Sequence, residues 1–218
     1  MERQGTTMGT DREKLEQDIR ELCQRGDTAG AVERALQGYG MEIMRLMASV
    51  LHNPELAKDA FSAFCESLLK GLPAFRWESS FRTWAYRLAR NACYQLSHAP
   101  SARETPVSAS GIPEAPLRHR SDTQPWRRTS VKERFRALRE SLEPEDRMLL
   151  LLRVDQRLAW TEVAHIMWDS DEPATGAELT RKATALRQQF QRIKVHLRQM
   201  AIEQGLIEQE DQPGESAS

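Results

Sequence analysis

The stretch FRWESSFRTWAYRLARNACYQL, residues Phe75–Leu96, decides the fold that we predict for this chain of 218 residues. After a short loop at 76–79, apolar residues recur at steps of three and four, which is the spacing of one helical face. Ser79 or Ser80 is suited to cap the start of this helix. The stretch therefore predicts an amphipathic helix whose inner face is Phe81, Trp84, Ala85, Leu88, Ala89, Ala92 and Leu96.

A second stripe on the same helix is polar. It follows Thr83, Arg87, Arg90 and Tyr94, with Asn91 beside it, and so presents positive charge, an amide and an aromatic ring together. Such a combination suits nucleic acid, because phosphates pair with the charges and bases stack on rings. On periodicity alone, the ordinary solvated face of a surface helix stays open as the alternative.

Residues 75–91, FRWESSFRTWAYRLARN, closely resemble the promoter-melting segment of bacterial sigma factors of the extracytoplasmic-function group, in the sigma-70 family. The order aromatic, Arg, acidic, Ser, Phe, Thr-Trp, Tyr-Arg and Ala-x-Asn matches without a gap. The resemblance implies that this loop and helix contact the −10 promoter element, with Trp77 exposed to receive a flipped base. The residues implied are Phe75, Arg76, Trp77, Glu78, Ser79, Ser80, Arg87, Arg90 and Asn91.

Three helices are predicted before this stretch. The first covers 11–25, the second opens after Asp27 and ends before Pro54, and the third runs from there to Lys70. Gly38 and Gly40 make a bend or break in the second helix plausible.

The third helix lies where the sigma family docks on the clamp helices of RNA polymerase. The resemblance implies that Asp59, which stands at the family's acidic position, binds the polymerase. The neighbouring residues implied are Ser62, Ala63 and Glu66. Ser62 and Ala63 replace the Gln and Glu of the usual pattern, and Cys65 replaces a large aromatic residue.

Residues 142–154 and 157–167, LEPEDRMLLLLRV and RLAWTEVAHIM, again resemble the sigma family, here the helix-turn-helix domain that binds the −35 element. The first helix of that motif is matched by Glu162, Val163, Ala164 and Ile166. Ala159 stands where the family has a capping Ser or Thr, and this substitution costs a helix start about 1 kcal/mol.

The segment 168–184, WDSDEPATGAELTRKAT, replaces the family's short turn before the recognition helix. Helix is plausible from Glu178 onward, so we expect the recognition helix to start one to three turns early. Leu186, Phe190, Ile193, Leu197 and Met200 form its predicted core stripe, and a short coiled coil is the alternative use of this pattern. The opposite face is basic, and the resemblance implies that it reads DNA through Arg181, Lys182, Arg187, Gln188, Gln191, Arg192, Lys194 and Arg198.

Acidic residues stand directly ahead of this basic helix, at Asp169, Asp171 and Glu172. One hypothesis is that they lie across the basic stripe in solution and mask it until DNA binds. The alternative is a passive surface loop, since long loop insertions cost little stability.

Composition excludes several other classes of protein. There is no nucleotide-binding Gly loop and no HExxH, and the five histidines are scattered, so no catalytic residue, cofactor or metal is predicted. Three distant cysteines fit buried thiols rather than a disulfide framework or a zinc site. No apolar run reaches the ~18 residues of a membrane span, and no secretory signal is apparent. These features predict a cytoplasmic protein that contacts no membrane.

The predicted fold is all-α, with two small helical domains joined by a flexible Pro/Ser-rich linker that carries five of the ten prolines. The predicted segments are a disordered lead-in at 1–10, a polymerase and −10 domain at 11–98, the linker at 99–130, a −35 helix-turn-helix domain at 131–207, and a disordered acidic tail at 208–218.

The predicted function is that of a sigma factor that gives bacterial RNA polymerase its promoter specificity and melts the −10 element. Its implied partners are core polymerase, through the clamp helices and flap, and promoter DNA, with room for an anti-sigma factor. The alternative is a stand-alone helix-turn-helix regulator, or an interaction protein, that no longer docks to polymerase.

Overall fold

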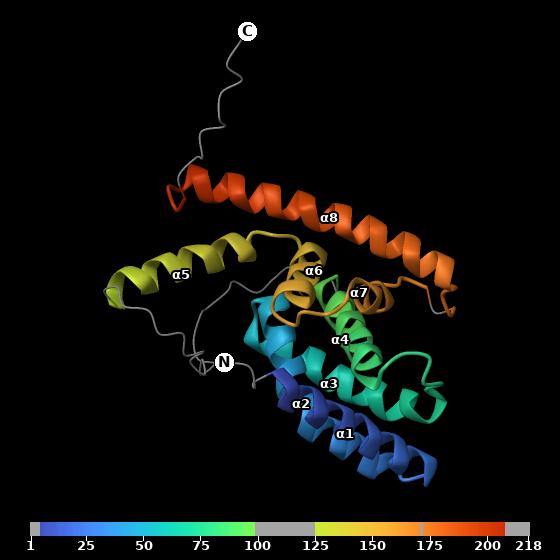
Figure 1. The fold of residues 1–218 in the computed structure, drawn as a ribbon. Helices are drawn as coiled ribbons and strands as arrows, with labels where there is room; N and C mark the ends of the chain where they lie inside the picture. The colour runs from blue at the N-terminus through green and yellow to red at the C-terminus, as the bar shows by residue number, and fades with distance from the viewer. Residues whose placement is uncertain (1–4, 99–124, 171, 208–218) are drawn as a thin grey trace.

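The computed structural model describes residues 5–98, 125–170 and 172–207. Within these residues all regular structure is helical, which confirms the all-α prediction (Figure 1). The elements are α1 (Gly5–Gln24), α2 (Thr28–Leu51), α3 (Pro54–Gly71), the 3-10 helix η1 (Leu72–Ala74), α4 (Phe81–Ser97), α5 (Pro125–Glu140), α6 (Pro144–Val154), α7 (Trp160–Ile166) and α8 (Gly176–Glu203). No helix in the described ranges is both long enough and apolar enough to span a membrane.

Helices α1 to α4 form the first half of the molecule. The expected break at Gly38 and Gly40 does not occur, because α2 is one continuous helix. Gly38 has a packing role instead: a Cβ at this position would lie 2.2 Å from a methyl of Leu15, so its absence lets α1 approach α2 closely. Helix α1 begins at Gly5 rather than Asp11, so part of the lead-in predicted to be disordered is helical.

The inner face predicted for α4 is confirmed. Phe81, Ala85, Ala89 and Ala92 are buried, while Trp84, Leu88 and Leu96 are partly buried against the same core. Ser80 is the residue that caps the helix, as one of the two predicted candidates. Asn53 caps α3 with its side-chain oxygen, and Pro54 follows at the first turn.

Helices α5 to α8 form the second half. Residues 125–130, predicted to belong to the linker, are the first turns of α5, while the rest of the linker and the tail at 208–218 lie outside the described residues. Helix α8 starts at Gly176, which confirms the early start predicted for the recognition helix. Thr175 and Glu178 make a capping box there, in which the Thr175 hydroxyl accepts from the Glu178 N–H at 3.3 Å and Glu178 accepts from the Thr175 N–H at 2.8 Å.

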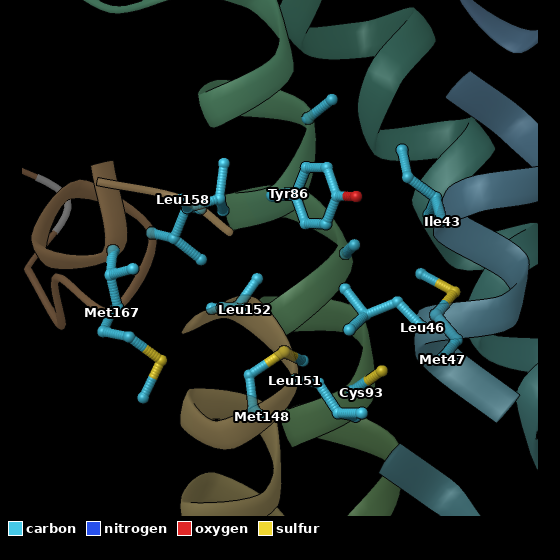
Figure 2. Close-up of a cluster of buried hydrophobic side chains, with 14 of the residues drawn as sticks. Ile43, Leu46, Met47, Tyr86, Cys93, Met148, Leu151, Leu152, Leu158 and Met167 are labelled. Carbon is cyan, nitrogen blue, oxygen red and sulfur yellow. The ribbon is translucent and has the colours of Figure 1, made fainter. Parts of the chain in front are cut away.

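The two halves pack against each other around α6. Five consecutive α6 residues, 148–152, are buried, so this helix is apolar all round and needs cover on more than one side. Helix α8 covers one side, while α2 and α4 of the first half contact the other. Figure 2 shows side chains from both halves in one cluster, among them Ile43, Leu46, Met47, Tyr86, Cys93, Met148, Leu151, Leu152, Leu158 and Met167.

A buried arginine joins the halves at the end of α2. Arg147 donates to the carbonyl of Val50, the next to last residue of α2, and to the carbonyl of Leu142 at 2.7 Å. It also donates to the carbonyl of Arg139 at 3.1 Å. A cation suits this position because the carbonyls at a helix C-terminus carry partial negative charge. We call the packing of α6 and α7 on α2 and α4 the closed arrangement.

Candidate nucleic-acid interface

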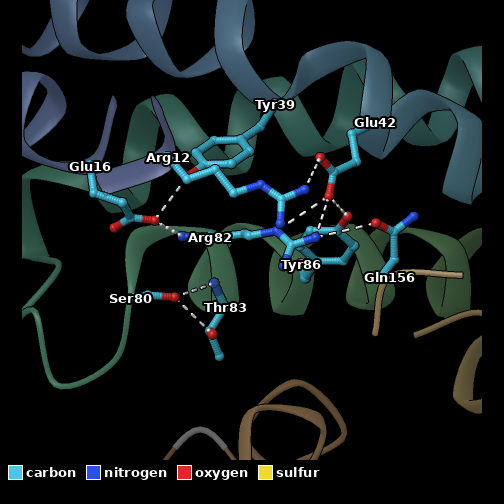
Figure 3. A network of polar contacts seen from close by, with 9 residues as sticks. All are labelled: Arg12, Glu16, Tyr39, Glu42, Ser80, Arg82, Thr83, Tyr86 and Gln156. Carbon is cyan, nitrogen blue, oxygen red and sulfur yellow. Dashed lines mark hydrogen bonds and ion pairs between the residues drawn. The ribbon is translucent and has the colours of Figure 1, made fainter. Parts of the chain in front are cut away.

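The start of α4 is held by a carboxylate from α1 as well as by its own cap. Glu16 accepts from the backbone N–H of Phe81 at 2.7 Å. It also accepts from the backbone N–H of Arg82 at 2.8 Å (Figure 3). Ser80 accepts from the N–H of Thr83 at 3.0 Å. Three of the four N–H groups that a helix start leaves unpaired therefore have partners, and negative charge lies where the helix dipole favours it.

A polar network that the sequence did not reveal lies behind this helix start. Arg82 is buried and donates to Glu42 of α2 and to Gln156, at 3.2 Å each, and Tyr86 donates to the same Glu42 (Figure 3). Burial of Glu42 favours its neutral form, but hydrogen bonds from Tyr86 and Arg82 and the Arg82 charge outweigh it and lower the pKa of Glu42. Burial raises the pKa of Tyr86, with the Glu42 charge next in importance, so Tyr86 stays a hydrogen-bond donor.

The loop before α4 is compact and aromatic. Phe75 stacks on Trp84 with ring centroids 4.6 Å apart, and its ring lies 4.9 Å from that of Trp77. Trp77 has a positive φ of 59°, unusual for a residue with a large side chain, and the guanidinium of Arg20 lies over its ring at 5.3 Å.

Trp77 is partly buried, whereas the sequence predicted an exposed ring. The reason is this packing between Phe75 and Arg20, which the sequence pattern did not contain. Arg76, Glu78 and Ser80 are exposed, and Ser79 is partly buried. The loop thus presents polar groups to solvent and holds its indole against the core.

The polar stripe of α4 is covered by the second half rather than open. Thr83 and Arg90 are buried, Arg87 and Asn91 are partly buried, and Tyr94 is exposed. The cover comes from α7 and the segment that follows it, because α4 contacts α7 extensively. Helical periodicity does not indicate this cover, because α4 and α7 are far apart along the chain.

Arg90 is at the centre of the covered stripe. Its Nη2 donates to Glu145 of α6 and to Asp169, both at 2.6 Å, and Asp169 also accepts from Lys182 of α8 at 2.6 Å. Burial of Asp169 opposes its ionisation, but hydrogen bonds from Lys182 and Arg90 prevail and lower the pKa of Asp169. Arg87 donates to the backbone carbonyl of Ser170. The predicted −10 and −35 residues thus meet through one acidic side chain.

The basic face of α8 is otherwise turned to solvent. Its core stripe is confirmed, because Leu186 and Ile193 are buried and Phe190, Leu197 and Met200 are partly buried. Lys182 is partly buried by its pairing with Asp169. The other predicted −35 residues are exposed, namely Arg181, Arg187, Gln188, Gln191, Arg192, Lys194 and Arg198.

The predicted polymerase-docking residues share one exposed face of α3. Asp59, Ser62 and Glu66 are exposed and Ala63 is partly buried, as spacing by three and four along a helix requires. Glu66 pairs with Lys70 at 3.2 Å, and Leu69 nearby is 51% exposed. Acidic and apolar groups therefore lie side by side on this surface.

The described residues hold no group of three or more His, Cys, Asp or Glu side chains that is arranged to bind a metal ion. All three cysteines are free thiols. Cys93 is buried as predicted, and burial raises its pKa to about 12, whereas Cys23 and Cys65 are only partly buried.

Comparison with known proteins identifies relatives of this chain. Residues 36–98, which span most of α2 through α4, match the family model described as Sigma-70 region 2. The chain is also 26% identical over 146 residues to the RNA polymerase sigma factor YlaC of Bacillus subtilis (strain 168), an alignment that covers 63% of this chain and 79% of YlaC. Both matches confirm the resemblance of this chain to RNA polymerase sigma factors of the sigma-70 family.

Proposed function

We propose that this sigma factor melts the −10 promoter element with the loop at 75–80 and helix α4, and reads the −35 element with helix α8. As a sigma factor it is a transcription initiation factor with promoter specificity, and not an enzyme. Its work is therefore binding and positioning, in the cytoplasm where bacterial polymerase transcribes.

The observation that carries the proposal is the rigid start of α4. Glu16 and Ser80 pair three backbone N–H groups there, so the loop that precedes the helix has a fixed anchor. Arg76 and Glu78 extend from that loop into solvent. A base flipped from the non-template strand would contact these polar groups and replace the Arg20 guanidinium on the Trp77 ring, where stacking contributes ~1 to 3 kcal/mol per base.

Phosphates of the melted strand would follow the polar stripe of α4. Arg87 and Arg90 supply guanidinium groups that match phosphate oxygens, and Asn91 supplies an amide beside them. These contacts position the strand, whereas the loop reads its bases.

Helix α8 has the length and charge for the major groove. It runs from Gly176 to Glu203 and exposes Arg187, Gln191 and Lys194 along one side, so base edges and phosphates are both within reach. Two contacts of modest strength, carried by one chain, then act together at high effective concentration.

Docking to core polymerase is assigned to the exposed face of α3. Asp59 and Glu66 supply negative charge to basic side chains of the clamp helices, and Leu69 supplies apolar area. Charge reversal by Asp59→Lys should weaken co-purification with core polymerase. Glu21→Lys on α1 is the control, because Glu21 is exposed, lies on another helix, and pairs locally with Gln17 and Arg25.

Permanganate footprinting tests the melting assignment directly. Trp77→Ala and Asn91→Ala should reduce thymine reactivity in the −10 region while circular dichroism shows an unchanged helix content. Wild-type reactivity in both variants would contradict the proposed role of the loop and α4.

A further inference from the structure

The segment Trp168, Asp169 and Ser170, which we call the strap, contacts both proposed DNA-binding faces at once. Asp169 accepts from Arg90 of α4 and from Lys182 of α8, each at 2.6 Å. Ser170 accepts from Arg87 through its backbone carbonyl. The strap is held in shape at its root, because the indole N–H of Trp168 donates to the Glu172 carbonyl at 3.1 Å.

Each strap contact uses an oxygen where DNA would offer one. A carboxylate oxygen meets Arg90, another meets Lys182, and a carbonyl oxygen meets Arg87. A surface hollow of ≈ 290 Å³ lies at this junction, lined by Trp168, Asp169, Ser170 and Lys182. The strap thus resembles a short piece of anionic backbone laid between α4 and α8.

The strap leaves Arg90 incompletely paired. The Arg90 side chain is only 9% exposed, and its Nη2 serves both Glu145 and Asp169. Its Nε is buried and has no hydrogen-bond partner in the described part of the chain. A phosphate can accept from Nε and Nη2 together in the bidentate geometry that arginine favours, so it would satisfy a donor that the two carboxylates leave unpaired.

We propose that the strap is an internal substitute for the nucleic-acid backbone that stabilises the closed arrangement, and that DNA phosphates displace it from Arg87, Arg90 and Lys182. The inference rests on the proposed function, since it assumes that these three side chains bind DNA. Because one carboxylate holds both Arg90 and Lys182, its displacement frees the −10 and −35 faces together. Binding at one face then favours binding at the other, as required of two ligands that select the same open state.

The strap contributes only part of the free energy that stabilises the closed arrangement over the open one. The apolar cluster between α6 and the α2–α4 pair contributes as well, and it has no affinity for DNA. The strap, by contrast, competes with phosphate for Arg87, Arg90 and Lys182, and shares only Arg90 with Glu145 of α6. Removing its charge should therefore affect opening and DNA affinity in the same direction.

Asp169→Asn in the full chain tests the proposal, and Glu172→Gln is the matched control. Glu172 carries the same charge in the same loop, and among the residues that the structure describes its carboxylate forms no ion pair. Because Asp169 is 63% exposed, its replacement by an isosteric amide should leave the fold intact, and thermal unfolding of both variants verifies this.

Opening is measured by single-molecule energy transfer between dyes on Met41→Cys of α2 and Val195→Cys of α8, which are 66% and 69% exposed. Cys23, Cys65 and Cys93 are replaced by Ala in this background. Loss of two charge pairs predicts an open fraction and an affinity for a mixed-sequence single-stranded DNA that rise by about fivefold in Asp169→Asn. Adding that DNA to the wild-type chain should also raise the open fraction, whereas inorganic phosphate at equal ionic strength should not.

Two results would overturn the proposal: an open fraction in Asp169→Asn equal to that of the wild-type chain, or equal shifts in Asp169→Asn and Glu172→Gln. The second result would mean that only net charge matters. The energy-transfer readout needs neither polymerase nor a promoter. A failure of promoter melting in the footprinting assay would thus refute the proposed function without altering the opening result, and the reverse also holds.

Discussion

Replacing Glu16 by Ala removes the carboxylate that fixes the start of α4. Two backbone N–H groups, those of Phe81 and Arg82, lose their acceptor, and both residues are buried in the structure. The Tyr39 hydroxyl, which donates to Glu16 at 3.0 Å, loses its partner too. Hydrogen bonds to a charged group contribute about 1.5 to 3 kcal/mol, and the unpaired donors that remain incur a desolvation cost.

The expected loss in the free energy of unfolding is about 2 to 4 kcal/mol, since water reaches part of this site and the Ser80 cap remains. That is a large share of the ~5 to 15 kcal/mol typical of a folded domain. Urea denaturation followed by circular dichroism at 222 nm measures it, as a shift of the midpoint with an unchanged slope.

Glu21→Ala is the control on the same helix. Glu21 is exposed, and among the described residues its side chain pairs only with Gln17 and Arg25, so its removal should cost at most about 0.5 kcal/mol. Equal destabilisation by Glu16→Ala and Glu21→Ala would refute the reasoning, because it would mean that α1 does not hold the α4 start in solution.

Three further variants test other parts of the fold. Trp84→Ala should lower the free energy of unfolding by about 2 to 4 kcal/mol, measured in urea, because its ring stacks on Phe75 and packs against Gly71. Arg147→Ala should cost about 3 to 5 kcal/mol in the same measurement, since it leaves buried carbonyls without their donor, and a loss below 1 kcal/mol would contradict the assigned role. Burial first, and then the Arg147 charge, lower the pKa of His52 to about 4, so the unfolded chain binds the extra proton and stability should fall as pH drops from about 6.5 to about 4. His52→Asn should flatten that part of the stability curve, and an unchanged slope would mean that other groups titrate there.

Sequence periodicity predicted the helices whose buried residues form a continuous stripe along their own sequence. The inner face of α4 followed from steps of three and four, and helix predicted from Glu178 onward lies within two residues of the observed α8 start at Gly176. Such signals are local, because a helix displays its buried side in its own residues.

What the sequence did not predict depends on distant partners. Glu16 lies 65 residues from the N–H of Phe81 that it caps, and Arg90 lies 79 residues from Asp169. No periodic pattern links residues that are so far apart. The sequence pattern therefore placed Arg90 on an exposed polar face. The run Met148–Leu152 was the one available signal of packing between the halves, because a helix buried all round requires a second covering surface.

The hypothesis that the acidic loop lies across the basic helix anticipated one of the two contacts that Asp169 makes. Asp169 does contact the basic helix, at Lys182, but its other partner is Arg90 of α4, which the sequence could not place beside it. Asp171 lies outside the described residues. Masking by the loop stays a prediction, now confined to Asp169 and testable at a single residue.

Run-off transcription with purified core RNA polymerase tests the central claim most directly. The templates are pooled bacterial genomic fragments, and transcript 5′ ends are mapped with and without the chain. The account predicts new transcripts that begin at a fixed distance downstream of a shared pair of −35 and −10 elements, only when the chain is present, and their loss in Trp77→Ala. Identical transcripts with and without the chain, together with binding of the chain to duplex DNA alone, would contradict it and favour a stand-alone regulator.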